Sequence, residues 1–160
     1  MGQDIKMTPE ANGLTLHCKS FYELTLDELY ALLHTRSNVF IVEQDCVYQD
    51  LDNDDQAALH TWLTRGDKIV AMLRICPAGK HLEEVSLGRV ITTERGFGFG
   101  EQMVKIGIRL AIERMGARVI KIQSQEQAKG FYAKLGFLPT SEPYMHEGLP
   151  HRDMEWRAED

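Results

Sequence analysis

The sequence predicts a mixed α+β fold of three layers, in which a mostly antiparallel sheet lies between helices. In the first half, strand-like runs are separated by compact turns such as Arg65-Gly-Asp67, which has the composition of a β-hairpin. In the second half, one strand leads through a glycine-rich loop into a long amphipathic helix that ends at Gly116. This order of elements is typical of α+β or mixed sheets and not of a doubly wound parallel sheet.

Length and composition indicate one domain of ordinary composition, with 160 residues of which 43% are apolar and 26% charged. We expect a flexible leader over 1–13 and a single folded domain over 14–160. The net charge of −6, without any basic cluster, argues against a nucleic-acid partner. The chain start lacks the plan of a signal peptide and no run is apolar enough to cross a membrane, which predicts a cytoplasmic protein. The scattered Cys18, Cys46 and Cys76 are expected to be reduced thiols.

Hydrophobic periodicity and turn residues set the expected elements. Thr25 caps the first helix, and Glu28 completes a capping box. Beyond Arg36 this helix either continues or breaks into a second short one. The strand at 119–123 follows a helix that returns the chain to the sheet, so we expect it to be a parallel neighbour of the fourth strand. The expected strands are 14–19, 57–64, 68–76, 83–93, 119–123, one that begins at 137–139, and 154–157; the later helices are 99–115 and 128–135.

The segment between the fourth strand and the long helix is the most informative one. Glycines alternate at Gly96, Gly98 and Gly100, and no Ser, Thr, Asp or Asn stands where a helix cap is normally found. The first backbone N–H groups of the helix are therefore open to an anion, and Arg95 favours phosphate there. A flexible turn, with glycines chosen only for their backbone angles, explains the pattern equally well. The spacing fits neither a Walker A loop nor the dinucleotide-binding fingerprint.

The connection that follows the first helix is polar and acidic. Its alternating Asp50, Asp52 and Asp54 suggest a calcium loop, but the positions that require glycine and glutamate hold Asp55 and Thr61. We expect a solvated turn, with the acidic rim of a substrate site as the alternative, and no bound metal.

Two motifs together resemble the signatures of the GNAT N-acetyltransferase superfamily. Arg95-Gly-Phe-Gly-Phe-Gly100 resembles the Q/R-x-x-G-x-G/A loop that binds the pyrophosphate of acetyl-CoA. Ala128-Lys-Gly-Phe-Tyr-Ala-Lys-Leu-Gly-Phe137 resembles A-x-x-x-Y-x-x-x-G-F and lies at the expected distance downstream. Leu87-Gly-Arg89 and Pro150-His151 are among the segments similar to the ElaA-like branch, whose members mostly have no assigned substrate. The resemblance covers nearly the whole chain.

This resemblance implies a sheet of about six or seven strands that splays between the fourth and fifth strands, with helices on both faces. Acyl-CoA would insert at the splay, where a strand edge can pair with the pantetheine arm. The loop N–H groups would hold the pyrophosphate. The implied cofactor-binding residues are Val90, Ile91, Arg95, Gly96, Phe97, Gly98, Phe99, Gly100, Gln125 and Tyr132.

The resemblance also assigns parts of the chemistry. Tyr132 takes the family's acid position and would protonate the leaving thiolate, although helix packing also explains this residue. The backbone N–H of Ile91 would polarise the thioester carbonyl, and no covalent intermediate is needed.

The general base is open between several residues. Glu43 ends an apolar run in which burial would raise its pKa, and His60 is the second candidate. Glu126 and His151 are further candidates, and a water chain without a single base is another solution. Arg89 is expected to brace a carboxylate such as that of Glu43.

We therefore expect an acetyl-CoA-dependent N-acetyltransferase that acts on a small amine, an exposed lysine or an N-terminus. A non-catalytic acyl-CoA sensor and a structural or partner-binding domain are the alternatives. The acceptor is not identified by the sequence, and both a monomer and a homodimer are open.

Overall fold

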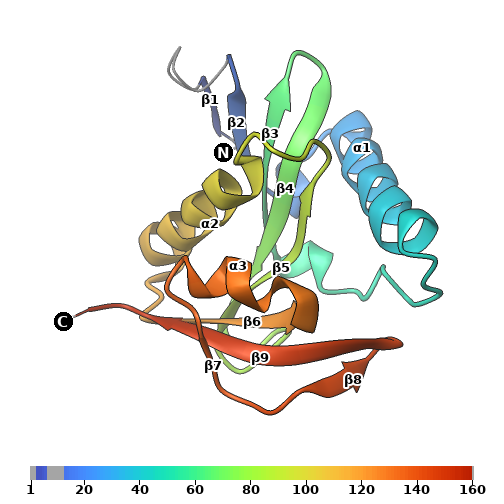
Figure 1. The fold of residues 1–160 in the computed structure, drawn as a ribbon. Coiled ribbons are helices and arrows are strands. Elements are labelled where there is room, and N and C mark those ends of the chain that lie inside the picture. The colour runs from blue at the N-terminus through green and yellow to red at the C-terminus, as the bar shows by residue number, and fades with distance from the viewer. Residues whose placement is uncertain (1–2, 7–12, 160) are drawn as a thin grey trace.

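The computed structural model describes residues 3–6 and 13–159, which form a mixed sheet with helices on both faces (Figure 1). Within these ranges the sheet has nine strands in the order β1-β2-β3-β4-β5-β6-β9-β7, and β8 pairs with β9. The strands are β1 Gln3–Lys6, β2 Thr15–Ser20, β3 Leu59–Arg65, β4 Lys68–Cys76, β5 Val85–Thr92, β6 Val119–Gln125, β7 Leu138–Pro139, β8 Tyr144–His146 and β9 Leu149–Arg157.

The strand directions confirm the mixed, mostly antiparallel sheet. β5 and β6 are parallel, and the other strand pairs are antiparallel. Only β1 and β8 were not expected, and the strand expected at 154–157 is the end of the longer β9. Most of the leader expected over 1–13 lies outside the described residues, and the described part of it forms β1.

Three α-helices accompany the sheet: α1 Leu26–Arg36, α2 Phe99–Met115 and α3 Lys129–Ala133. The predicted capping box of α1 is present, because the Glu28 N–H donates to Thr25 Oγ1 and Glu28 Oε1 accepts from the Thr25 N–H. Beyond α1 the chain stays helical as a π-helical turn, Ser37–Glu43. A short 3-10 turn precedes α3, which makes this α-helix shorter than expected. Within the described part of the chain, none of the helices is long and apolar enough to span a membrane.

Two apolar clusters lie on opposite faces of the sheet, because successive residues of a strand point to opposite sides. On one face, Leu63 and Leu73 belong to the larger cluster, to which α2 contributes Phe99 and Met103. On the other face, a smaller cluster contains Trp62 and Met72, which pack with Leu32 of α1 and Ile91 of β5. Figure 1 shows α1 and α2 on the two sides of β3 and β4.

The sheet opens between β5 and β6, as predicted for the fourth and fifth strands. These strands pair only at Val85↔Ile120 and Ser86↔Lys121, at the beginning of β5. A β-bulge follows in β5: Arg74 faces Gly88 and Met72 faces Ile91, so Leu73 lies opposite two residues, Arg89 and Val90. The bulge turns the second half of β5 away from β6 and leaves that edge without a neighbouring strand.

Candidate functional site

A cavity of about 670 Å³ occupies the opening between β5 and β6. One wall comes from β5 through Val90 and Ile91, and the facing wall comes from the end of β6 through Ser124 and Gln125. The N-terminal end of α2 and the residues of α3 close one end, and the other end is lined by the segment after α1 and the β8–β9 hairpin. The cavity therefore connects the two faces of the sheet.

The bulge that opens this cavity is held by ion pairs at Arg89. This residue has a φ of 53°, which is rare for any residue except glycine. Its Nε donates to Asp50 Oδ1 at 2.8 Å, its Nη2 donates to the Asp50 carbonyl oxygen at 2.9 Å, and its guanidinium lies 5.7 Å from the Tyr48 ring centroid. Arg89 thus braces a carboxylate as expected, and that carboxylate is Asp50 instead of Glu43.

Arg89 belongs to a larger network that we call the Asp–Arg cluster, made of Arg36, Asp50, Asp52, Asp55, Arg74 and Arg89. The expectation of a solvated turn is wrong for Asp50 and Asp55, which are each only 6% exposed. They are buried because Arg36 bonds both of them, Asp50 at 3.0 Å and Asp55 at 2.7 Å. The cluster ties the segment after α1 to β4 and β5, and it thereby fixes one wall of the cavity.

The glycine loop enters α2 without a side-chain cap, as predicted. Gly98 is the N-cap residue with a φ of 74°, and Gly96 has a φ of 86°. Gly100 lies against β5, because a Cβ atom there would come within 2.7 Å of Thr92 Cγ2. Arg95 and Gly100 line the cavity, whereas the Phe99 side chain is 1% exposed in the core and offers only its backbone. The free amides at this helix start form a site suited to an anion.

Tyr132 of α3 lines the same cavity from the face that carries α2. Its side chain packs edge-on against Phe131 and Phe137, with ring centroids 5.1 and 5.7 Å away. Burial raises the pKa of the phenol, so the hydroxyl keeps its proton at neutral pH. None of the described residues forms a hydrogen bond with this hydroxyl, which leaves it available to a ligand.

The two residues named first as general base are not brought to the cavity. Glu43 ends the π-helical turn with an exposed side chain, so the burial expected for it is not found. His60 is 4% exposed in β3 behind the Asp–Arg cluster, where its Nε2 lies 2.9 Å from the Asp55 carbonyl oxygen and burial lowers its pKa. Glu126 is paired with Arg152 at 3.0 Å and lies outside the cavity lining. His151, in contrast, is part of the lining.

The half of the cavity nearer α1 contains further polar groups. They include His81, from the turn between β4 and β5, and Gln123 of β6, whose Oε1 lies 3.2 Å from His81 Nε2. His146 of β8 also lines this half. A motif search misses this group because its members come from three separate segments that only the sheet topology brings together.

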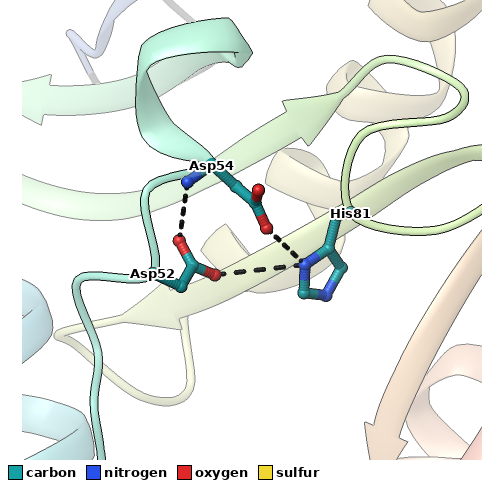
Figure 2. A group of neighbouring side chains, drawn as sticks. All are labelled: Asp52, Asp54 and His81. Atoms are coloured by element: carbon teal, nitrogen blue, oxygen red, sulfur yellow. Dashed lines mark hydrogen bonds and ion pairs between the residues drawn. The ribbon is translucent and has the colours of Figure 1, made fainter.

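Figure 2 shows His81 beside two carboxylates, with Nδ1 2.7 Å from Asp54 Oδ2 and 4.0 Å from Asp52 Oδ2. The three groups could share a cation by distance alone. Asp52, however, already accepts bonds from Arg74 and Arg89, and the Arg74 guanidinium lowers the pKa of this carboxyl far below its usual value. Two guanidinium charges at this carboxylate disfavour a metal ion, so the group acts as an anchor for the turn that carries His81.

Comparison with known proteins places this geometry in a family. The acetyltransferase (GNAT) domain family matches residues 23–158. The chain is 37% identical to Protein ElaA of Escherichia coli (strain K12) over 136 residues, which cover 82% of this chain and 89% of that protein.

Solved structures with a similar fold include two that cover most of this chain. The crystal structure of Escherichia coli ElaA superposes with a TM-score of 0.84 at 34% identity and covers 90% of this chain and 99% of that one. An acyl-CoA N-acyltransferase from Pseudomonas aeruginosa has a TM-score of 0.84 at 33% identity, with 89% and 99% covered.

Proposed function

The chain belongs to the ElaA-like branch of the GNAT acetyltransferases, and from this premise we propose that it transfers an acetyl group from acetyl-CoA to a primary amine. The observation that carries the proposal is that the uncapped start of α2 and the buried Tyr132 hydroxyl open on one cavity. The free amides at the start of α2 suit the pyrophosphate of coenzyme A. The Tyr132 hydroxyl suits the sulfur at the other end of the pantetheine arm.

The unpaired half of β5 supports the binding of acetyl-CoA. Val90 lies in the bulge and Ile91 directly after it, where β6 no longer pairs with β5, so this free strand edge can bond the amides of the pantetheine arm. The side chain of Gln125 faces this edge across the cavity, where its Nε2 lies 3.3 Å from Gln44 Oε1. Arg95 and the amides at 96–100 would hold the pyrophosphate.

Acyl transfer then follows by direct attack of the amine on the thioester. A backbone N–H on the free edge of β5 would stabilise the negative charge on the carbonyl oxygen. The Ile91 N–H expected for this role points to β4 instead, because the Thr93 N–H two residues on donates to the Val70 carbonyl oxygen. Tyr132 would donate its proton to the sulfur as the carbon–sulfur bond breaks. The raised pKa of Tyr132 means that this proton is present at neutral pH.

Thiol release from acetyl-CoA across a panel of free lysine, spermidine, a small arylalkylamine and short peptides tests the proposal. We expect turnover with at least one amine, and Tyr132→Phe should lower kcat by about 10²- to 10⁴-fold, the usual contribution of an acid catalyst. Tyr30→Phe is the matched control, because Tyr30 is 73% exposed on α1 and should retain full activity.

Calorimetry with coenzyme A separates the alternatives. Heat of binding without turnover of any amine would favour an acyl-CoA sensor. A folded protein that binds no coenzyme A at millimolar concentration would contradict both the transferase and the sensor.

A further inference from the structure

We propose that His151 is the general base that takes the proton from the attacking amine, an inference that rests on the proposed function. His151 lies in β9 opposite Gln125 of β6 and Tyr144 of β8, and its side chain lines the cavity. The sequence alone left it among several candidates.

Strand register places His151 and Tyr132 on opposite faces of the sheet. Ile122 and Met154 form a cross-strand pair and belong to the apolar cluster that includes Tyr132. His151 lies three residues before Met154 in an unbroken ladder, so its side chain points to the other face. Both residues nevertheless line the one cavity. An acid at one face and a base at the other is the arrangement required when the thiol leaves on one side of a carbonyl and the amine arrives on the other.

The hydrogen bond of the imidazole ring determines its tautomer. Nδ1 lies 2.8 Å from the Leu149 carbonyl oxygen. A carbonyl oxygen only accepts, so Nδ1 carries the hydrogen and Nε2 of the neutral ring carries a lone pair. Among the described residues, none forms a hydrogen bond with Nε2. The one atom of the ring that can accept a proton is therefore unoccupied by the protein.

The ring is also fixed in orientation. It stacks on Tyr144 with centroids 6.3 Å apart and an interplanar angle of 26°, and it contacts His146 edge-on at 5.1 Å. The residue as a whole is 9% exposed. A base that is already oriented loses little entropy when the amine binds.

The other titratable residues of the lining fit the role less well. Both nitrogens of His81 are occupied, by Asp54 and Gln123. Asp52 is bonded to two arginines. His146 and Glu147 are exposed, and among the described residues none forms a hydrogen bond with either side chain that would hold it toward a thioester at the β5 edge.

The proposed step balances in atoms and protons. The amine nitrogen forms a bond with the thioester carbon, and His151 Nε2 accepts one N–H proton. The tetrahedral intermediate then collapses, the carbon–sulfur bond breaks with its electron pair on sulfur, and the Tyr132 hydroxyl protonates that sulfur. The products are the N-acetyl amine and free coenzyme A, and exchange with water returns a proton from His151 to Tyr132.

Several titratable groups surround the proposed base. The titratable groups around the ring are Tyr144 and His146 of β8, Glu147 of the adjoining turn, Asp153 of β9, and His81 and Arg89 across the cavity. Of these groups, His146 and Glu147 are the alternative bases that the kinetic test must separate from His151.

Kinetics of His151→Gln provide the first test, with acetyl-CoA and whichever panel amine the wild type turns over. We expect kcat to fall about 10²- to 10⁴-fold at neutral pH while the calorimetric affinity for coenzyme A is unchanged. The turnover that remains in the variant should rise with pH, because water and hydroxide must then take the proton. His34→Gln, an exposed position on α1 outside the cavity, should behave as wild type. Full activity in His151→Gln, or the same loss of kcat in His146→Gln or Glu147→Gln instead, would overturn the assignment.

A second measurement does not depend on an acceptor. Two-dimensional ¹⁵N–¹H NMR of the imidazole rings should show His151 in the Nδ1–H tautomer, with its Nε2 signal moving on addition of acetyl-CoA. An Nε2–H tautomer would disprove the inference even if no amine is turned over. Conversely, an active wild type with an unimpaired His151→Gln leaves the proposed function standing and removes only His151.

Discussion

At the scale of single residues, the buried ion pairs of the Asp–Arg cluster have a larger effect on the shape of the cavity than any one proposed catalytic residue. Arg36 and Arg74 are only 1% and 2% exposed, and each is paired with two aspartates. Charges at such depth are tolerated because every carboxylate has a guanidinium partner at hydrogen-bond distance. Asp50 also holds Arg89 in its left-handed conformation, so the same network maintains the bulge that opens the cavity.

Removing one of these cations should therefore be costly. Arg36→Met leaves the buried Asp50 and Asp55 short of a partner, and we expect a loss of about 3–5 kcal/mol in the free energy of unfolding by urea. Arg157→Met is the matched control, because the Arg157 side chain is 67% exposed in its pair with Glu155 and should contribute less than about 1 kcal/mol. Equal effects of the two substitutions would show that the cluster is not a unit of stability.

At the scale of elements, α2 must lie close to the sheet if its first turn is to face the cavity. Gly107 permits this approach: a Cβ atom there would lie 2.9 Å from Leu73 Cδ2 and 3.2 Å from Leu73 Cδ1. The periodicity of α2 predicted that a broad apolar face lies on the sheet, but it could not show which position needs to be glycine. That requirement depends on the β4 side chain that the fold places opposite.

Two alanine substitutions test this packing. Gly107→Ala overpacks the contact with Leu73 and should reduce the free energy of unfolding by about 1–3 kcal/mol. Gly130→Ala in α3 meets no atom within 4 Å, so helix propensity should stabilise the protein by up to about 1 kcal/mol. Opposite signs in urea titrations are the expected result, and a stabilising Gly107→Ala would mean that α2 can move away from the sheet without cost.

At the scale of the whole molecule, the sequence predicted those features that depend on residues close together along the chain. The uncapped helix at Gly98, the capping box at Thr25 and the parallel return of β6 follow from turn residues and periodicity, and the structure confirms them. Burial of the acidic segment was not predictable, because Asp50 is buried through its pairing with Arg36 and Arg89, which lie 14 and 39 residues away along the chain. What distinguishes His151 from the other candidate bases is its position between β6 and β8, and no local sequence pattern contains these cross-strand contacts.

Burial of ionisable groups throughout the molecule should give the stability a maximum near neutral pH. Burial lowers the pKa of His60, and the Arg74 guanidinium lowers that of Asp52. In both cases the unfolded chain binds the proton more readily, so the free energy of unfolding should decrease as pH falls, first below about 6.5 through His60 and further below about 4 through Asp52. Burial raises the pKa of the Cys18 and Cys76 thiols. Above about pH 8.5 these thiols ionise in the unfolded chain but stay protonated in the folded protein, so the free energy of unfolding should also decrease there.

Urea unfolding followed by circular dichroism from pH 4 to 10 under reducing conditions measures both slopes. We expect a dome whose acid side between pH 8 and 5.5 flattens in His60→Gln, because glutamine keeps a donor for the Asp55 carbonyl but does not titrate. The alkaline side should flatten in Cys76→Ala, which removes a buried thiol at little change in volume. If the free energy of unfolding of the wild type is constant from pH 8 to 5.5, His60 is protonated equally in the folded and unfolded states. Its position behind the Asp–Arg cluster would then not exclude the charged form.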